Sequence, residues 1–270
     1  MKKRTASNGK QDVHGGNIGS TDAIPTVDIL GISIHQLTRR ELLQLLRERL
    51  EQELTTWLVT VNAELVVRAG DDSAVASALE KADLRVADGA GVVWAARALR
   101  DVELERLPGV EIAEELVKWA AEEGLKVYFL GAEPGVAEAA VGQLCHRYPG
   151  FVTAGCRHGY FTEMEKEDIL EEIKGAEPDI LLVALGAPRQ ELWLAEHQGE
   201  LSVPVAVGVG GTFDVWAGRV KRAPAWMGDA GLEWLFRLIV QPWRVRRMLA
   251  LPRFVQRVIK EKYTGRRSEK

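Results

Sequence analysis

Polar side chains and glycines follow five apolar runs of this sequence, and their types suit the binding of a polar ligand. Each also has a structural interpretation: Asp88-Gly89 can form a turn, Gly210-Gly211 can allow tight packing, and Pro188 can begin a helix. The candidates are Thr60 and Asn62 in TVNAE, Asp88 in VADGAG, Tyr160 in HGYF, Gly186 and Gln190 in LGAPRQE, and Gly210, Gly211 and Asp214 in GVGGTFD.

Strand-like and helix-like runs alternate along the chain and must position these residues. Apolar runs predict strands over 27–34, 56–61, 84–87, 126–131, 151–155, 179–186 and 203–211, and helical spacing predicts helices over 37–53, 64–69, 91–100, 111–123, 135–148, 163–176 and 190–198. Thr38 and Glu41 form a capping-box pattern, and Gly124 is expected to end the fourth helix. The alternation predicts an α/β fold, a Rossmann-like, mostly parallel sheet flanked by helices.

Parallel strands bring their carboxyl ends to one edge of a sheet, and ligands of such sheets bind beyond that edge. All the candidates above follow predicted strands, so we expect them to share one ligand site. This convergence is what favours function over the structural interpretation of each residue taken alone.

Two further motifs carry weaker signals. LGAEPG at 130–135 could hold a phosphate at a helix N-terminus, but the chain lacks the full glycine fingerprint of dinucleotide-binding proteins. GDDS at 70–73 could bind a metal, yet Asp and Ser between two helices more commonly act as caps. We therefore expect no metal and no cofactor.

The charge of the chain is unevenly distributed. The net charge is −4, but residues 219–270 carry 14 basic and 4 acidic residues, whereas the remainder carries 21 basic and 35 acidic ones. A basic segment of this kind favours an anionic partner, either a membrane surface or nucleic acid. We predict three regions: a disordered leader at 1–24 without the apolar core of a signal peptide, an α/β domain at 25–218, and a basic amphipathic appendage at 219–270.

The appendage carries an apolar set at helical spacing, with arginine and lysine on neighbouring or opposite arcs. No apolar run is long enough to span a bilayer, so an interfacial helix is expected, broken into short segments by Pro242 and Pro252. The two cysteines, Cys145 and Cys156, are expected to be buried and reduced, as suits the cytoplasm. The apolar set comprises Leu251, Phe254, Val255, Val258 and Ile259.

The motifs together resemble the WecG/TagA/CpsF glycosyltransferase family over residues 29–248. TVNAE, ADGAGVVWA, RLPGVEI, KVYFLGAEPGVAE, HGYF, DILLVALGAPRQE and the run from GVGGTFD to QPWRVRR occur in the family's order. The chain is most similar to the branch that transfers N-acetylmannosamine from UDP to the 4-hydroxyl of GlcNAc-diphospho-undecaprenol. That reaction forms the linkage unit of wall teichoic acid, on the cytoplasmic face of the cell membrane.

The resemblance also implies roles for individual residues in an inverting, metal-independent transfer. Asp88 is the expected base, and Arg106 is expected to offset charge on the departing UDP. Thr60 and Asn62 would line the cleft, while Gln190 would hydrogen-bond the sugar or diphosphate. Tyr160 and Asp214 are expected to recognise uridine, although Tyr160 could instead be a core ring. The expected diphosphate contacts from the appendage are Arg237, Arg244 and Arg247.

Other functions remain open at this point. A sister transferase of the family could use UDP-N-acetylmannosaminuronate or another nucleotide sugar. Nucleic-acid binding by the basic tail would be steeply salt-dependent and independent of lipid, and we do not expect it. A nicotinamide-dependent oxidoreductase is disfavoured by the missing glycine fingerprint. The exposed apolar faces expected of the tail could also support a homo-oligomer.

Overall fold

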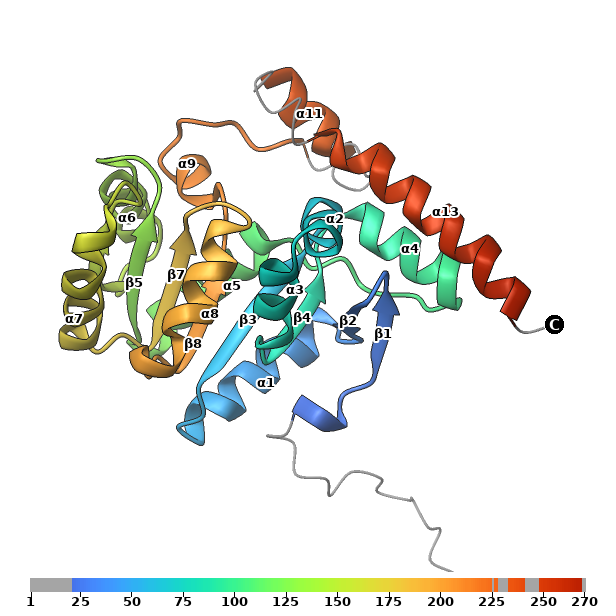
Figure 1. The fold of residues 1–270 in the computed structure, drawn as a ribbon. Helices are drawn as coiled ribbons and strands as arrows, with labels where there is room; N and C mark the ends of the chain where they lie inside the picture. Colours follow the sequence, from blue (N-terminus) through green and yellow to red (C-terminus); the bar gives the residue numbers. More distant parts are fainter. Residues whose placement is uncertain (1–20, 225, 228–232, 241–247, 269–270) are drawn as a thin grey trace, which may run out of the picture.

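The core of the protein is a six-stranded sheet in which every strand pair is parallel, as the computed structural model of the chain shows (Figure 1). The structure describes residues 21–224, 226–227, 233–240 and 248–268. The strand order is β4-β3-β8-β7-β5-β6, so the predicted α/β, Rossmann-like class is confirmed. The strands are β3 (Thr56–Val61), β4 (Leu84–Ala87), β5 (Lys126–Gly131), β6 (Val152–Arg157), β7 (Ile180–Ala184) and β8 (Val205–Gly208).

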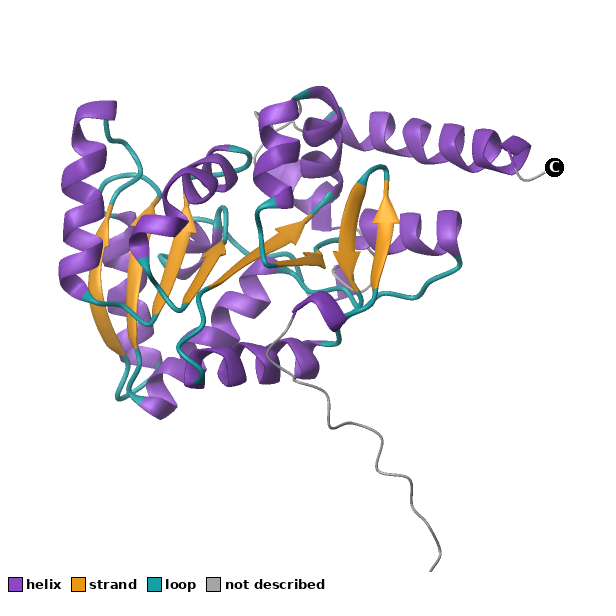
Figure 2. Ribbon diagram, turned by 60° about the horizontal axis from the view of Figure 1, so that its bottom comes forward, coloured by secondary structure: helices purple, strands orange, loops and turns teal. Residues whose placement is uncertain are grey.

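Helices cover both faces of this sheet (Figure 2). Alternate side chains of a strand enter opposite cores: Tyr128 and Leu130 of β5 pack on one face, and Val127 and Phe129 on the other. Strands buried on both faces explain the continuous apolar runs of the sequence. One core includes α2 (Ala63–Asp71), α3 (Ser73–Glu80), α4 (Ala90–Arg100), α7 (Lys166–Ala176) and α8 (Arg189–Leu201); the other includes α1 (Arg39–Glu51), α5 (Gly109–Glu123), α6 (Val136–Arg147) and α9 (Thr212–Trp216).

The predicted helix boundary signals are confirmed. The Thr38 side chain accepts from the Glu41 backbone N–H, and the Glu41 carboxylate accepts from the Thr38 backbone N–H at 2.8 Å. The bond from the Thr38 backbone N–H, followed by one that the Thr38 hydroxyl donates to the same carboxylate, lowers the pKa of Glu41. Helix α5 ends at Gly124 in the left-handed region. Two short 3-10 helices, Thr21–Ala23 and Glu163–Glu165, complete the helical elements outside the tail.

The run predicted as one strand over 27–34 is in fact an antiparallel hairpin. Strand β1 (Thr26–Ile29) pairs with β2 (Ile32–His35) in a separate two-stranded sheet. Leu30 and Gly31 both have positive φ, as a two-residue turn that matches strand twist requires. The sequence interpretation was wrong because Leu is rare at such a position, so the turn was hidden within an apolar run.

The C-terminal region forms α11 (Glu233–Val240) and α13 (Ala250–Ser268), and α13 packs against α2 and α4 (Figure 1). Phe254 and Val258 were predicted to face a membrane. They are instead buried in the core that α2 and α4 form with the sheet. Pro252 does not break the helix, because it lies in the first turn of α13, where no intrahelical N–H partner is lost. Pro242 lies outside the described residues.

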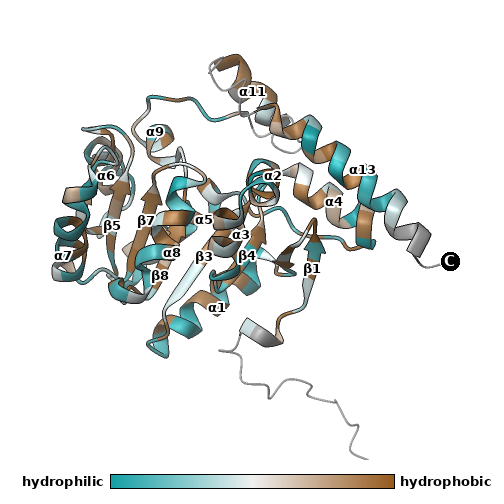
Figure 3. Cartoon of the chain, viewed as in Figure 1, coloured by the Kyte–Doolittle hydropathy of each residue, from teal (hydrophilic) through white to brown (hydrophobic). Residues whose placement is uncertain are grey.

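Figure 3 shows apolar and polar residues interspersed along α13. The part of the apolar set that stays exposed consists of Val255 and Ile259, with Leu251 half-buried. Across the part of the chain that the structure describes, no helix combines the length and apolar character needed to cross a membrane.

The expectation of two buried cysteines is wrong. Both thiols are free, but Cys145 is exposed on α6 and Cys156 is half-buried on the edge strand β6. Burial, followed by the nearby Glu138 and Glu172 carboxylates, raises the pKa of Cys156. Cys145 is not one of the α6 residues that enter the core, and Cys156 lies on the edge strand β6, where it packs against the core only in part.

Candidate active site

A cavity of about 940 Å³ opens beyond the carboxyl ends of the sheet strands. This volume is near the upper end of the range for small-molecule sites. Its wall includes every candidate from the α/β domain, so residues far apart in sequence converge as the parallel sheet predicted. They are Thr60, Asn62, Asp88, Arg106, Tyr160, Gly186, Gln190, Gly210, Gly211 and Asp214.

The order of the strands in the sheet determines the order in which the candidate residues lie along its edge. Asp88 follows the outermost strand β4, and Tyr160 follows β6 at the opposite end. Thr60 lies in β3, the neighbour of β4, and Asn62 comes directly after that strand. Five strand spacings separate β4 from β6, which is roughly 24 Å. The cavity is therefore elongated along the edge, with the carboxylate of Asp88 toward one end and the Tyr160 ring toward the other.

Backbone hydrogen bonds hold Asp88 and Arg106 at the same strand end. The Asp88 N–H donates to the Val61 carbonyl at 2.8 Å, which extends the β3–β4 pairing by one residue. The Leu107 N–H donates to the Ala87 carbonyl at 2.7 Å and brings the segment carrying Arg106 to β4. A carboxylate and a guanidinium are thus positioned at one end of the cavity.

Thr60 and Asn62 lie at the end of β3 in different settings. The Thr60 hydroxyl lies so near α5 that a Cβ added at Gly109 would come within 2.8 Å of it. Asn62 caps α2, since its side-chain oxygen accepts from the Leu65 N–H at 3.0 Å. The side-chain oxygen of Asn62 is thereby held by the protein, and the residue lines the cavity.

The side chain of Gln190 makes hydrogen bonds within the protein at both ends of its amide. Its nitrogen donates to the Glu191 carboxylate at 2.8 Å, and its oxygen accepts from the Gly210 N–H at 3.0 Å. Gln190 and Glu191 are 5% and 3% exposed, and a Cβ at Gly208 would come within 2.6 Å of the Gln190 nitrogen. The geometry makes Gln190 a support for the glycine loop after β8.

Tyr160 lies on a chain of linked loops at the other end. The Gly159 N–H donates to Ala132 at 2.8 Å, and the Ala132 N–H donates to Ala184 at 3.0 Å, which joins the loops after β6, β5 and β7. Tyr160 is 66% exposed, so the alternative of a buried core ring is excluded. Its ring is available for stacking on a planar ligand.

The partial positive charges of helix N-termini, rather than charged side chains, are what favour an anion in the cavity. The N-terminal residues of α2, α4, α5, α8 and α9 line the wall, and helix N-termini attract negative charge. The charged side chains oppose this: among the described lining residues, five carboxylates accompany two guanidinium groups. They are Glu64, Asp88, Glu133, Glu191 and Asp214, and Arg106 and Arg189.

The segment after α9 is tied to the α/β domain. Arg219 donates to Glu133 at 2.9 Å, and Arg222 and Arg39 both pair with Glu111 in the first turn of α5. Burial acts to raise the pKa of Glu111, but the two guanidinium groups outweigh it and hold the pKa below its ordinary value. These contacts fix the start of the predicted appendage beside the cavity.

The tail completes the wall of the cavity, but the predicted arginines fall largely outside the described residues. Arg237 lies on α11, but the structure does not describe its side chain. Arg244 and Arg247 lie wholly outside the described residues. Trp234 and Met248, on either side of the segment 241–247, line the cavity. The role of the three arginines stays a prediction.

The two weaker motifs can now be placed. LGAEPG follows β5, and Ala132 and Glu133 of that loop line the cavity. In GDDS, Asp72 caps α3 by accepting from the Ala74 N–H at 2.9 Å, so the capping interpretation is confirmed. Asp71 pairs with Arg257 of α13.

Arg189, Glu191 and Trp94 are among the lining residues that the sequence interpretation missed. Arg189 and Glu191 lie within the quoted motif LGAPRQE, and the Arg189 guanidinium lies 4.9 Å from the Phe161 ring centre, next to Tyr160. The motif was a sufficient signal for both. Trp94 on α4 also lines the cavity, and its exposed ring in ADGAGVVWA could have been found by placing it one turn after Ala90, the first residue of the helix.

Known proteins match this chain along most of its length. The sequence model described as Glycosyl transferase WecG/TagA/CpsF family matches residues 27–268. Proteins named N-acetylglucosaminyldiphosphoundecaprenol N-acetyl-beta-D-mannosaminyltransferase, from Staphylococcus aureus strains NCTC 8325 / PS 47 and MRSA252, are each 34% identical over 238 residues. The matched region covers 87% of this chain and 93% of each relative. These matches show that the chain belongs to the WecG/TagA/CpsF family of glycosyl transferases.

Proposed function

We propose that this protein transfers N-acetylmannosamine from UDP-N-acetylmannosamine to the 4-hydroxyl of GlcNAc-diphospho-undecaprenol, forming the linkage unit of wall teichoic acid. The observation that carries the proposal is that one cavity is lined by Asp88 at one end and by Tyr160 and Asp214 toward the other. A base and a nucleotide site on a shared cavity are what an inverting sugar transfer requires. The relatives' name supplies the sugar and the acceptor.

In the proposed mechanism the donor lies along the sheet edge. Tyr160 stacks on uracil, Asp214 accepts from the base or ribose, and the glycine loop supported by Gln190 faces the diphosphate. Asp88 accepts the proton of the acceptor 4-hydroxyl while its oxygen forms a bond to the anomeric carbon. The bond from that carbon to the diphosphate oxygen breaks, and its electron pair leaves with UDP. Thr60 and Asn62 orient the reacting sugars.

The leaving diphosphate needs positive charge beyond the two guanidinium groups of the described wall. Arg106 is at the Asp88 end, and we propose that Arg237, Arg244 and Arg247 contribute the rest. The support for this is that Trp234 and Met248, which flank their segment, line the cavity. Helix N-termini add partial positive charge without further side chains.

Donor choice tests the proposal directly. Purified enzyme is assayed for UDP release and for lipid-linked disaccharide with UDP-N-acetylmannosamine, UDP-N-acetylmannosaminuronate and UDP-N-acetylglucosamine. We expect kcat/KM for UDP-N-acetylmannosamine to exceed the others by at least about tenfold, the discrimination that a few pocket contacts provide. Reactions without acceptor serve as controls for hydrolysis. A higher kcat/KM with the uronate would assign the chain to the sister reaction instead.

The acceptor's lipid also implies that the enzyme works at the inner face of the cell membrane. We propose that α13 contacts anionic headgroups through Arg253 and Lys260, which are exposed and two turns apart on one side of the helix. Deleting the tail would be a poor test, because Phe254 and Val258 belong to the core.

A charge-removal variant gives a cleaner test of membrane contact. The double variant Arg253→Gln/Lys260→Gln should lose roughly 25-fold in binding to anionic vesicles, at about 1 kcal/mol per charge, and change little with neutral ones. The matched control is Arg40→Gln/Lys118→Gln, which removes two exposed charges from α1 and α5. Equal losses in both variants, or none in the first, would rule out α13 as the contact. Cosedimentation at low and high salt measures the effect.

A further inference from the structure

One end of the cavity is apolar and is built from helices rather than from strand ends. This apolar end consists of Trp94 on α4, Trp234 on α11, and Met248, Leu251 and Val255 at and near the start of α13. The remainder of the wall carries the carboxylates, the two arginines and the glycine loops. A cavity with one polar and one apolar part suits a ligand with the same division.

The apolar end adjoins the carboxylate that we propose as the base. Helix α4 begins at Ala90, directly after Asp88 and Gly89, and Trp94 is one turn further along, about 6 Å on the helix axis. Ala90, Gly91 and Trp94 all line the cavity, so one side of α4 connects the two regions. Because β4 is the outermost strand, this side lies away from Tyr160, where the nucleotide is proposed to bind.

The opposite wall is held in place by contacts outside the cavity. Phe254 and Val258 of α13 are buried among α2 and α4, and the Arg257 guanidinium donates to the Val67 carbonyl at 3.1 Å. Leu251 and Val255 are one turn apart on the neighbouring side of α13, toward the cavity. The wall is thus anchored in the described structure independently of any ligand.

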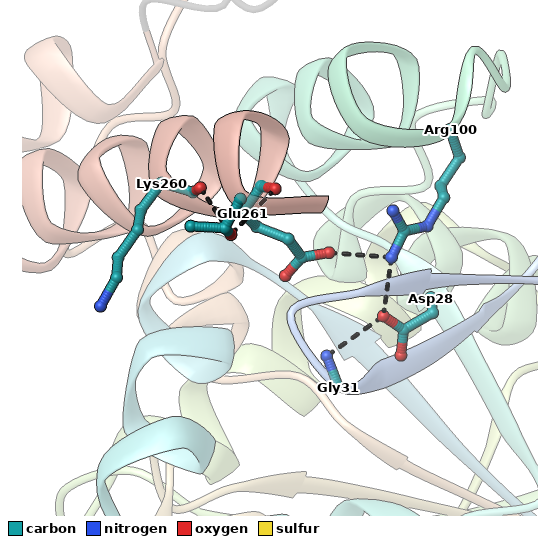
Figure 4. A network of polar contacts seen from close by, with 6 residues as sticks. Asp28, Gly31, Arg100, Lys260 and Glu261 are labelled. Carbon is teal, nitrogen blue, oxygen red and sulfur yellow. Dashed lines mark hydrogen bonds and ion pairs between the residues drawn. The ribbon is translucent and has the colours of Figure 1, made fainter. Parts of the chain in front are cut away.

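A polar network fixes the far end of the same helix (Figure 4). The Arg100 guanidinium donates to Glu261 of α13 at 2.8 Å and to Asp28 of the hairpin at 3.5 Å, and Asp28 also accepts from the Gly31 N–H. Helix α13 is therefore joined to α4 and to the β1–β2 hairpin. A preformed wall loses little conformational entropy when a ligand binds.

We propose that the apolar end is a binding subsite for the first isoprene units of the acceptor's lipid chain. The inference rests on the proposed function, in which the acceptor's diphosphate connects a sugar to such a chain. With the acceptor sugar at Asp88, the chain must leave on the side away from the nucleotide, where the apolar end begins. Trp94 is 42% exposed and Val255 40%, so both have apolar surface for a ligand to cover.

This subsite is distinct from contact with a bilayer. Ile259 lies one turn beyond Val255 on α13 and is 45% exposed, but it is not among the residues that line the cavity. A bilayer could contact both side chains, whereas a chain in the cavity contacts Val255 and not Ile259. The two residues therefore form a matched pair for an experiment without membranes.

The test is calorimetric titration of farnesyl diphosphate and methyl diphosphate into UDP-loaded enzyme, without vesicles or detergent and at monomeric ligand concentrations. At about fourfold for each methylene removed from water, wild type should bind farnesyl diphosphate at least about 100-fold more tightly than methyl diphosphate. Trp94→Ala and Val255→Gln should each weaken farnesyl binding about tenfold and leave methyl binding unchanged. Ile259→Gln should match wild type with both ligands.

Each other outcome overturns the subsite. Equal affinity of wild type for both ligands would show that the chain is not bound. If Trp94→Ala and Val255→Gln weakened the binding of both ligands equally, the site would have been lost in general. If Ile259→Gln weakened the binding of farnesyl diphosphate, the chain would bind on the outer surface. Because no turnover is needed, failure of sugar transfer with chain-dependent binding intact would remove the proposed function and retain the subsite.

Discussion

The variant Asp88→Asn is expected to lose at least about a hundredfold in kcat, with only a small change in KM for the nucleotide sugar. A positioned general base contributes roughly 10²- to 10⁴-fold, and an amide cannot accept the proton in its place. The substitution keeps the size and shape of the side chain, and the Asp88 backbone N–H still donates to the Val61 carbonyl. The loss should therefore report proton transfer rather than a change of fold.

Asp72→Asn is the matched control for this variant. Asp72 caps α3 outside the cavity, and asparagine caps a helix about as well as aspartate does. We expect its kcat to equal that of wild type, and thermal unfolding of both variants should show similar midpoints. A near-normal kcat for Asp88→Asn with UDP-N-acetylmannosamine and the lipid acceptor would remove Asp88 from the mechanism.

The part of this site that could be predicted from the sequence is the part set by strand ends. Asp88, Asn62 and Gly210 follow apolar runs, and a parallel sheet brings all such positions to one edge. The strand order was not accessible in the same way, because the runs show where strands end but not which strands are neighbours. The elongated arrangement from Asp88 to Tyr160 depends on that order.

The tail shows a different gap between sequence and structure. Helical spacing identified Phe254, Val255, Val258 and Ile259 as an apolar set, but periodicity does not say what covers an apolar face. In the structure Phe254 and Val258 pack on the domain, while Val255 and Ile259 remain partly exposed. The set is therefore divided between the protein core and surfaces available to ligand or lipid.

The hydrogen bonds of the Gln190 side chain could not be predicted from the sequence either. The motif LGAPRQE indicated that Gln190 belongs to the site, and its amide was expected to contact substrate. In the structure the two ends of that amide also hydrogen-bond within the protein, to Glu191 and Gly210, and its contact with substrate stays a prediction. The bond from Gly210 depends on the loop after β8, 20 residues further along the chain, and no local pattern contains it.

Arg106→Ala is the second variant with a large expected effect, a fall of about 10²- to 10³-fold in kcat. This is the typical cost of removing one preorganised group that stabilises charge developing in a transition state. Arg106 is one of two guanidinium groups among the described residues of a wall that also holds five carboxylates. The Leu107–Ala87 hydrogen bond fixes its segment beside Asp88, so the charge is already positioned before the reaction begins.

The control for Arg106→Ala is Arg97→Ala, which removes an exposed guanidinium from α4, where it pairs with Glu103 away from the cavity wall. It should leave kcat unchanged. Arg106→Lys should recover only part of the rate, because an ammonium cannot bind a diphosphate through two parallel hydrogen bonds. A fall in kcat with little change in KM would mean that Arg106 acts on the departing UDP, whereas a raised KM at constant kcat would mean that it only binds the donor. That second result would leave the charge of the leaving diphosphate to the helix N-termini and the arginines of the tail.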